Sequence, residues 1–284
     1  SYITEGMSLL GALLVIFIVN RDGAPEFKMT WCILICLLPV FGALIYLFVE
    51  LNLGGIGLKA RTYVRLKETE GLLLATERTK KAVAGSQADF RGFARYMEGT
   101  VGFPAYQGSE AVYYPSGEDK FKDLLKELQK AERFIFLEYF IMERGIMWNA
   151  ILDILKEKVK QGVEVRVMYD GMCSIMLLPY GYPSELEKYG IKAKMFAPIR
   201  PFLSTNQNNR DHRKIVVIDG KVAFTGGVNL ADEYINEKEV YGYWKDTAVK
   251  ITGEAVRSFT VMYLQMWHVS ENGAADEYEK YLQN

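Results

Sequence analysis

The stretch NNRDHRKIVVIDGKVAFTGGVNLADEY, residues 208–234, decides the fold of this chain. It contains two runs rich in apolar and β-branched residues, KIVVID and KVAFTGG, which predict two β-strands. Asp219 and Gly220 lie between the runs, and this pair is typical of a two-residue hairpin turn. Because IVVI is apolar without alternation, we expect its strand to lie in a sheet that is covered on both faces.

Strands and helices alternate outward from this hairpin. Similar apolar runs predict four further strands, at residues 133–142, 163–170, 191–197 and 247–253. Apolar residues at helical spacing predict helices at 148–161, 184–189 and 255–267. A helix is also expected ahead of the first strand, capped by Ser116 or Gly117. This alternation predicts an α/β fold with a mostly parallel or mixed β-sheet flanked by helices.

The hairpin stretch also carries residues suited to chemistry. His212, Lys214 and Asp219 form an H-x-K-x4-D pattern, and residues two apart on a strand project from the same face. A neutral imidazole beside an ammonium suits attack on a phosphodiester, because the imidazole is the nucleophile and the cation holds the non-bridging oxygens. Asp219 is seven positions from His212, on the opposite face of a regular strand, which favours a turn or supporting role.

Two glycines and an asparagine continue this pattern. Gly226 and Gly227 would let the backbone approach a phosphate closely, and Asn229 follows at an expected helix start. Backbone N–H groups and the helix dipole would then point at the phosphate. A bare H-x-K-x4-D occurs by chance in many chains. Here the strand placement, the GG-x-N continuation and the flanking arginines all agree.

The composition excludes several classes of protein. The chain has 284 residues with 34 basic and 35 acidic side chains, and the net charge of −1 gives no global electrostatic case for nucleic-acid binding. Three cysteines cannot form a disulfide framework, and no spacing of ligand residues indicates a metal site. The second of only two histidines, His268, has no lysine two residues later and lies in an apolar helical pattern, which indicates packing.

The first 50 residues are expected to form a transmembrane hairpin. Residues 31–49 carry no charge, and as one helix they would span about 28 Å, close to the thickness of a bilayer's hydrocarbon core. Residues 6–20 are also uncharged, although fewer. Pro39 and Gly42 would kink the second helix or let its partner helix approach closely. Buried core helices are the alternative interpretation.

Basic residues follow the second apolar segment. Lys59, Arg61, Arg65 and Lys67 come before the first acidic residue of this region. Because basic flanks stay in the cytoplasm, the part of the chain after residue 50 is expected to be cytoplasmic. These cations could also rest against anionic head groups, or they could act only as a topology signal.

The chain resembles the phospholipase D superfamily, whose HKD signature it contains, and more narrowly the bacterial cardiolipin synthases. The resemblance covers nearly the whole chain. It is carried by LPVFGALIYLF, SGEDKFKDLLKELQKAERFIFLEYFI, GVEVRVMYDG, HRKIVVIDGKVAFTGGVNLADEY and YWKDTAVKITGEAV. It implies a phospholipase D-like half-domain, with a mixed β-sheet flanked by helices, after the N-terminal two-helix transmembrane hairpin.

The resemblance implies a role for each matching residue and no cofactor or metal. His212 would take the phosphatidyl group as a phosphohistidine, while Lys214 and Asn229 would bind the phosphate. Asp246 would hydrogen-bond the far nitrogen of His212 and fix its tautomer. The other implied site residues are Asp219 of the catalytic motif, Gly227 at the phosphate, and Glu138 and Arg210 in supporting roles.

Three positions depart from the family's pattern. Asp211 stands where the family commonly has Asn, and it adds a negative charge beside the nucleophile. Lys245 stands where Arg is common, so it keeps the charge and loses the planar fork. Cys173 occupies a place usually held by Gly, and the sequence offers no reason for it.

The family's reaction needs two HKD motifs, because one histidine attacks while the other protonates the leaving alcohol. This sequence holds one such motif. We therefore expect a transmembrane hairpin at 1–50, a membrane-proximal helical linker at 51–104, the first phospholipase D-like domain at 105–272, and a tail at 273–284 that leads to a missing second half. A single-motif chain that completes its site in a homodimer is the alternative.

The resemblance implies a phosphatidyl transferase of phospholipid synthesis, which condenses two phosphatidylglycerols to cardiolipin and glycerol. A hydrolase with the same phosphohistidine chemistry and a non-catalytic half stay open as alternatives. The expected partners are phosphatidylglycerol and other phospholipids, the membrane, and a second HKD half from the same chain or a homodimer partner, with no nucleic acid. The expected location is the bacterial plasma membrane, crossed more than once, with the catalytic part in the cytoplasm.

Overall fold

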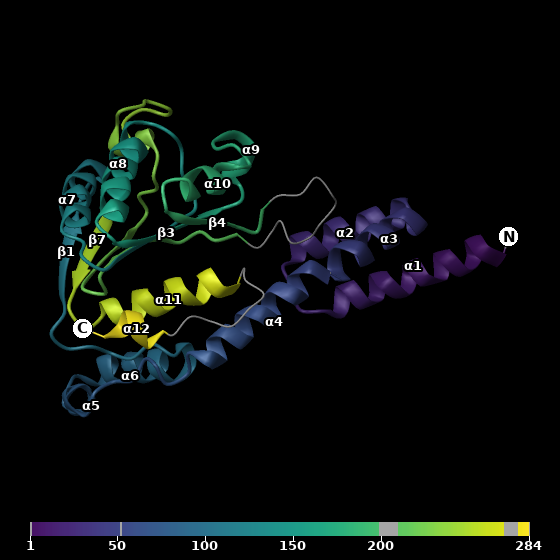
Figure 1. The fold of residues 1–284 in the computed structure, drawn as a ribbon. Coiled ribbons are helices and arrows are strands. Elements are labelled where there is room, and N and C mark those ends of the chain that lie inside the picture. Colours follow the sequence, from purple (N-terminus) through teal and green to yellow (C-terminus); the bar gives the residue numbers. More distant parts are fainter. Residues whose placement is uncertain (1, 52, 199–209, 270–277, 284) are drawn as a thin grey trace. The chain divides into compact units, whose positions relative to one another are not determined.

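The computed structural model describes residues 2–51, 53–198, 210–269 and 278–283 (Figure 1). The chain divides into two units, one formed by the residues up to Gly57 and the other starting at Leu58. Residues 273–277 of the expected C-terminal tail lie outside the described residues.

A seven-stranded mixed β-sheet organises the second unit. Its strand order is β1-β7-β6-β5-β2-β3-β4, with β2, β3 and β4 parallel to one another and the other neighbours antiparallel. The α/β fold with a mixed sheet is therefore confirmed. The strands are β1 (Glu110–Tyr114), β2 (Phe134–Tyr139), β3 (Glu164–Asp170), β4 (Lys192–Phe196), β5 (Lys214–Ile218), β6 (Val222–Gly226) and β7 (Ala248–Thr252).

The hairpin between β5 and β6 has the predicted turn. Asp219 and Gly220 both have positive φ, +54° and +70°, and the N–H of Lys221 donates to the carbonyl of Ile218 at 2.9 Å. Two central residues in the left-handed region define a type I′ turn, whose twist matches that of the flanking strands. The turn sets β6 beside β5, and pairing with β2 on the other side leaves β5 in the middle of the sheet, where all five of its residues are buried.

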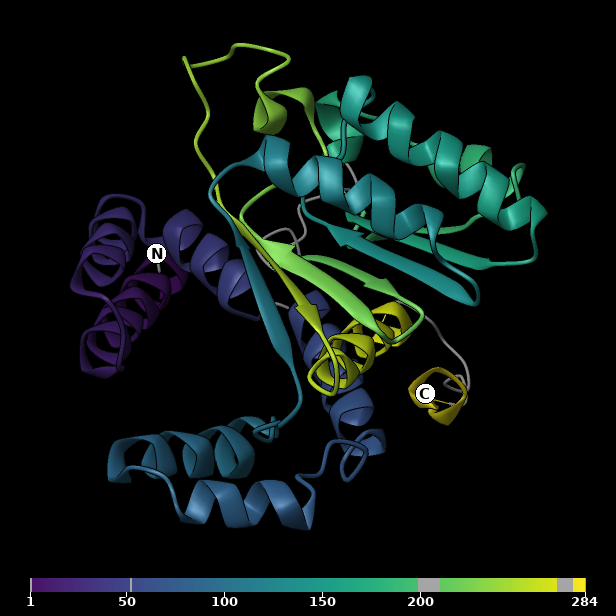
Figure 2. The ribbon, with the colours of Figure 1, turned by 90° about the vertical axis from the view of Figure 1, so that its left-hand side faces the viewer.

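Helices cover both faces of the sheet (Figure 2). One face packs against α7 (Gly117–Gln129) and α8 (Ile146–Lys160), with Leu128, Trp148 and Val216 in the shared core. The opposite face packs against α11 (Val256–Val269) through an independent core. Shorter helices complete this unit: α9 (Cys173–Met176), α10 (Tyr182–Glu187), the 3-10 helix η3 (Asp232–Ile235) and α12 (Glu279–Leu282).

The ends of these elements follow local signals in part. Ser116 caps α7 as predicted, because its side chain accepts a hydrogen bond from the N–H of Asp119 at 3.2 Å. The edge strand β1 was not predicted. Four of its five residues are exposed, so no continuous apolar run marks it in the sequence.

Helices also fill the region expected to be a helical linker. They are α4 (Leu53–Glu68), α5 (Glu77–Ala84), α6 (Ala88–Tyr96) and a π-helical turn, η1 (Met97–Val101). In the second unit, Gln265 of α11 donates to the Thr69 hydroxyl at 2.7 Å, and Arg257 donates to the Leu72 carbonyl at 3.0 Å. The segment after α4 is thus bonded to the helix that covers the sheet.

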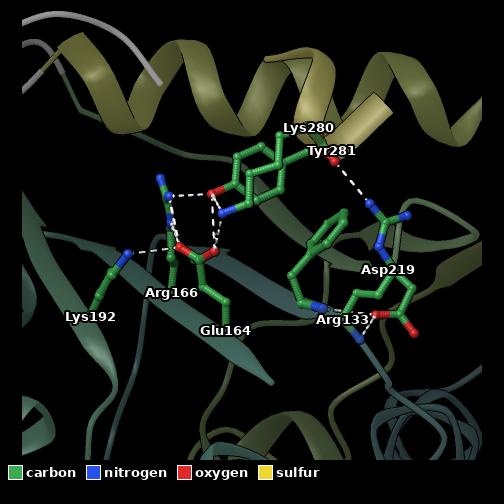
Figure 3. A network of polar contacts seen from close by, with 8 residues as sticks. Arg133, Glu164, Arg166, Lys192, Asp219, Lys280 and Tyr281 are labelled. Carbon is green, nitrogen blue, oxygen red and sulfur yellow. Dashed lines mark hydrogen bonds and ion pairs between the residues drawn. The ribbon is translucent and has the colours of Figure 1, made fainter. Parts of the chain in front are cut away.

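Helix α12 is tied to the sheet by a polar network (Figure 3). The Glu164 carboxylate, at the start of β3, accepts from Lys192 and Arg166 at 2.8 Å each and from the Tyr281 hydroxyl at 3.0 Å. Arg166 also donates to the Tyr281 oxygen at 2.6 Å. Burial acts to raise the pKa of Glu164, but the bonds from Lys192 and Arg166 outweigh it and lower that pKa to about 2.

The first unit differs from the two-helix hairpin that was expected. It contains three helices, α1 (Tyr2–Asn20), α2 (Pro25–Leu37) and α3 (Pro39–Leu51), because residues 31–49 break at Leu38. Pro39 ends α2, since a residue before proline is disfavoured in helical conformation. Within the described residues, no helix combines the length and the apolar character needed to cross a bilayer.

Gly42 lets α2 and α3, the two halves of the predicted 31–49 helix, pack closely, whereas the expectation had been a kink or the approach of the helix at residues 6–20. A Cβ atom at Gly42 would lie 2.7 Å from the Leu34 carbonyl oxygen and 2.9 Å from the Ile35 Cα. Trp31 and Tyr46 meet edge to face between the two helices, with ring centroids 5.4 Å apart.

Candidate active site

The predicted nucleophile lies at a pocket of about 270 Å³. The pocket is lined by residues around the start of β5, the end of β6 with the loop and η3 that follow, and the loop ahead of β7: His212, Lys214, Gly226, Gly227, Asn229, Tyr234 and Asp246. The fold therefore brings together five of the eight site residues predicted from the sequence. Because β5, β6 and β7 are antiparallel neighbours, the start of β5, the end of β6 and the loop ahead of β7 lie at the same end of these strands.

His212 and Lys214 form the predicted pair. β5 begins at Lys214, so His212 lies just ahead of the strand, where it is exposed. The Lys214 ammonium is 3.3 Å from Nδ1 of His212 and donates to the His212 carbonyl oxygen at 2.8 Å. Burial lowers the pKa of Lys214, while the carboxylates of Asp211 and Asp246 act against this effect. The arrangement holds a cation directly beside an accessible imidazole.

A phenylalanine that sequence reasoning missed packs against both members of the pair. The ring of Phe140 lies 4.6 Å from the His212 ring, centroid to centroid, and 5.2 Å from the Lys214 nitrogen. Phe140 follows β2 directly, and only the pairing of β2 with β5 brings it to the site. No motif marks such a residue, because its place depends on strand register.

Asp246 lies in the pocket but makes different bonds from those expected. Its Oδ1 accepts from the Thr247 N–H at 2.7 Å. The carboxylate also occupies the space beside Gly227, where a Cβ would lie 2.0 Å from Oδ1. Among the described contacts there is no hydrogen bond between Asp246 and His212, whose Nδ1 faces Lys214 instead.

Gly227 and Asn229 do not sit at a helix start, which corrects that prediction. Both lie in the loop after β6, and the helix that follows is the short 3-10 turn at Asp232–Ile235. The Gly227 N–H donates to the Thr247 carbonyl at 3.0 Å, so it is not aimed at a phosphate. The absence of a side chain at Gly227 instead makes room for Asp246.

Asn229 anchors the loops around the pocket. Its Oδ1 accepts from the Ile141 N–H at 3.0 Å, and its Nδ2 donates to the Tyr234 hydroxyl at 2.8 Å. The side chain is buried, with 3% of its surface exposed. An amide nitrogen carries two hydrogens, and among the described residues Nδ2 has the single acceptor Tyr234.

A second lysine lies near Asp246 and was also missed. Lys120, in the first turn of α7, is 2% exposed and donates to the Tyr139 hydroxyl at 3.0 Å. Burial lowers its pKa to about 7, although the charge of Asp246 acts to raise it. A signal for it existed, because Lys120 shares helical spacing with the buried Leu124 and Leu128.

Asp219, predicted as part of the catalytic motif, follows the far end of β5 and is not among the residues that line the pocket. Figure 3 shows it beside Arg133. Its carboxylate accepts hydrogen bonds from the backbone N–H groups of Glu132, Arg133 and Phe134, at 2.8, 2.7 and 2.8 Å. The residue therefore joins the hairpin turn to the start of β2. Its seven-residue distance from His212 had pointed to such a turn role.

The two supporting residues also lie away from the pocket. Glu138 of β2 is fully buried and pairs with Arg213, which in turn lies 3.4 Å from Asp211 Oδ1. Burial raises the pKa of Glu138 well above its usual range, and Asp211 adds to this while Arg213 opposes it. The carboxylate of Asp211 thus forms an ion pair with Arg213.

Arg210 holds the chain that leads into the catalytic motif. It donates to the Asp170 carboxylate at 3.3 Å and to the Ala197 carbonyl at 2.8 Å. Asp170 also accepts from the Asp211 N–H at 2.8 Å. These bonds fix the backbone just before His212.

His268 has the packing role that was predicted. It is 2% exposed near the end of α11, and its ring meets that of Tyr278 edge to face at 5.9 Å. It is not among the residues that line the pocket. In the described parts of the chain, no three His, Cys, Asp or Glu side chains are grouped so that they could hold a metal ion.

Two family models match this chain. The family model described as "Cardiolipin synthase, PLD-like domain" matches residues 124–267, and one described as "Phospholipase_D-nuclease N-terminal" matches residues 9–50. The first match covers half of the chain and includes the whole pocket.

Individual proteins are similar to this chain over most of its length. A Streptococcus mutans protein described as uncharacterized is 47% identical over 253 residues, which cover 89% of this chain and 55% of the relative. The cardiolipin synthase of Alkalihalophilus pseudofirmus is 34% identical over 272 residues, 92% of this chain and 52% of that protein. The chain spans about half the length of these curated relatives.

Among solved structures, Nuc from Salmonella typhimurium, a phospholipase D family member, aligns with a TM-score of 0.43 and 17% identity, covering 57% of this chain and 94% of that chain. The family match rests on the sequence model and on the relatives named cardiolipin synthase. The chain belongs to the cardiolipin synthase-like branch of the phospholipase D superfamily.

Proposed function

We propose that this chain supplies a phosphohistidine-forming half-site of a phosphatidyl transferase, which condenses two phosphatidylglycerols to cardiolipin and glycerol. The observation that carries the proposal is the contact between the exposed imidazole of His212 and the buried ammonium of Lys214 in one pocket. The relatives named cardiolipin synthase support the choice of reaction.

In the proposed first step, Nε2 of His212 attacks the phosphorus of phosphatidylglycerol. A phosphorus–nitrogen bond forms, and the phosphorus–oxygen bond to the terminal glycerol breaks. The glycerol oxygen takes a proton from a second HKD half, either of the same full-length chain or of a homodimer partner. A hydroxyl of a second phosphatidylglycerol then attacks the phosphohistidine and returns its proton to that half. A new phosphorus–oxygen bond forms, the phosphorus–nitrogen bond breaks, and cardiolipin and free His212 result.

The side chains around His212 serve this step in defined ways. Attack through Nε2 needs the imidazole proton on Nδ1, where Lys214 now lies. We infer that Lys214 turns to the non-bridging phosphate oxygens when the lipid binds, and that Nδ1–H then donates to Asp246. Asn229 adds one N–H to the phosphate.

The first unit suits a membrane setting for this chemistry. Its helices expose large apolar side chains, among them Leu13, Ile16, Phe17 and Phe41, each more than half exposed. A soluble surface rarely carries so many apolar side chains together. We propose that this unit associates with the plasma membrane from its cytoplasmic side, where the basic residues after it meet anionic head groups.

The test uses the chain's two histidines. Vesicles containing ³²P-labelled phosphatidylglycerol are mixed with the protein, and we expect label on the chain that survives alkali and is lost in acid, as phosphohistidine is. His212→Ala should abolish the label, and His268→Gln should keep it. Absence of label on the wild-type chain would mean a non-catalytic half.

The product separates transfer from hydrolysis. With membranes that carry the complete gene product, a transferase converts phosphatidylglycerol to cardiolipin. If phosphatidic acid were formed and no cardiolipin, the chain would be a phospholipase D-type hydrolase instead.

A further inference from the structure

The nucleophile of this site lacks the burial that usually holds a catalytic side chain in place. His212 is exposed and lies just ahead of β5, outside the hydrogen-bonded ladder of the sheet. The orientation of its imidazole must therefore come from neighbouring side chains. Such orientation matters, because a misplacement of about 1 Å can reduce the rate of a chemical step about 100-fold.

Phe140 is positioned to supply that orientation. Its ring contacts the imidazole of His212 at 4.6 Å between centroids, with the planes tilted by 49°. The same ring carries the Lys214 ammonium at 5.2 Å from its centroid. Aromatic and cation–π contacts of this kind favour one placement of the groups that they join. One side chain thus touches both the nucleophile and the phosphate-binding cation.

The backbone of Phe140 is in turn held by Cys173. The buried thiol donates to the Phe140 carbonyl at 3.2 Å and accepts from the Met142 N–H at 3.3 Å. Between these two bonds, the Ile141 N–H donates to Asn229. The segment after β2 is therefore fixed by side chains at three successive residues.

The state of the thiol suits this bridging role. Cys173 is 1% exposed, and burial raises its pKa to about 11, so it keeps the proton that it donates to Phe140. A glycine at this position would make neither bond. The structure thus explains the cysteine for which the sequence offered no reason.

We propose that Phe140 is a positioning residue for the His212–Lys214 pair, and that the Cys173 thiol fixes Phe140 by bridging the backbone on both sides of Ile141. The catalytic meaning of this arrangement rests on the proposed phosphohistidine chemistry. The positioning itself does not, since it concerns the packing of the imidazole in the resting protein.

The packing is measured by NMR on the full chain with isotope-labelled histidine, which gives only two sets of ring signals. An aromatic ring against the imidazole displaces the His212 ring-proton shifts from those of free histidine. We expect Phe140→Leu to move them toward the free values and Phe140→Tyr to restore them. Phe90→Leu, which changes a half-exposed ring on α6, serves as the matched control.

The rate of phosphohistidine formation is measured in parallel on phosphatidylglycerol vesicles. Phe140→Leu should slow labelling at saturating lipid about 10-fold or more, with little change in the lipid concentration at half-saturation, and Phe140→Tyr should recover most of the rate. Cys173→Ala should shift the His212 signals and slow labelling in the same direction. Cys173→Ser, which keeps a donor and an acceptor, should do so less, and Cys36→Ser on exposed α2 should have no effect.

Unchanged His212 signals in a folded Phe140→Leu protein would overturn the proposal. If Phe140→Leu did not fold, Cys173→Ala and Cys173→Ser would decide it, because equal signals in those two and in the wild type would also overturn it. A wild-type chain that showed the displaced His212 signals and no phosphohistidine would contradict the proposed function alone.

Discussion

Two lysines with lowered pKa values lie near the carboxylate of Asp246. Lys214 lines the pocket beside His212, while Lys120 is buried in α7 and bonded to the Tyr139 hydroxyl. An ammonium in such a place is costly to desolvate, and its retention near the proposed phosphate site is understandable if an incoming anion stabilises the charge. The resting protein is expected to lose some stability for this reason.

Lys120→Met tests that cost. In the unfolded chain a lysine has its ordinary pKa of 10.5, whereas in the folded chain the pKa of Lys120 is about 7. Between these values the unfolded state binds more protons, so the stability of the wild type should rise with pH, by up to about 1.4 kcal/mol per unit. The variant should lack this slope and unfold at higher urea at pH 7.

Urea midpoints at pH 7 and pH 9 measure the effect. Lys156→Met is the control. Lys156 forms an ion pair with Asp153, whose side chain is exposed, so this variant should leave the pH slope unchanged. Equal slopes in the wild type and in Lys120→Met would show that Lys120 stays charged in the fold.

Gly227→Ala tests the space reserved for Asp246. A methyl group there would lie 2.0 Å from Oδ1 of Asp246, so the carboxylate must move away from the pocket. We expect phosphohistidine formation to fall about 10-fold to 100-fold, since the geometry of reacting groups is disturbed. Gly92→Ala on α6, which would meet no atom within 4 Å, should keep full activity in the same assay.

At the scale of elements, the sequence predicts the turns, caps and strands that depend on residues close together in the chain. The type I′ turn, the Ser116 cap and the buried strands each depend on residues near in sequence, and the structure confirms them. The helix start expected at Asn229 is wrong, because that side chain is used to join Ile141 and Tyr234. The single helix expected at residues 31–49 is also wrong. Pro39 restricts the conformation of Leu38, so the apolar run forms two helices.

The hairpin turn offers a prediction about elements. Asp219→Ala removes an acceptor for three backbone N–H groups at the start of β2, and we expect a loss of about 2–4 kcal/mol in the free energy of unfolding. Asp219→Asn should lose less, because Asn keeps one acceptor and tolerates the positive φ of +54°. Urea unfolding measures both variants against Asp153→Ala, whose side chain is 76% exposed.

The same variants show whether Asp219 takes part in chemistry. Folded Asp219→Asn protein should form phosphohistidine at nearly the wild-type rate, because the residue lies at the far end of β5 from the pocket. A fully folded Asp219→Asn protein without label would contradict this placement of its role.

For the whole molecule, the distribution of charge says more than its sum. The net charge of −1 hides an excess of basic residues between Leu58 and Val101, where nine basic and five acidic side chains lie. The four cations that could rest against head groups, Lys59, Arg61, Arg65 and Lys67, are not equivalent. Arg65 is bound to Glu68 at 2.7 Å with 9% of its side chain exposed, and Lys67 pairs with Glu70 at 2.9 Å.

Of these four cations, Lys59 and Arg61 are therefore the more available to an anionic surface such as the proposed membrane. Both are exposed, and within the described residues neither takes part in an ion pair. Each unpaired cation near an anionic surface contributes about 1 kcal/mol to binding at low salt. Replacing both with glutamine should weaken the preference of the full chain for phosphatidylglycerol-containing over phosphatidylcholine vesicles by about 30-fold.

The matched control replaces Arg65 and Lys67 with glutamine, which changes the net charge by the same amount. We expect this pair to have the smaller effect, because those side chains are already held by Glu68 and Glu70. Vesicle co-sedimentation at low and high salt measures both, and the difference should shrink as salt screens the surface charge. Equal losses for the two double variants would mean that only the total charge acts on the membrane, and that no particular face of α4 meets the head groups.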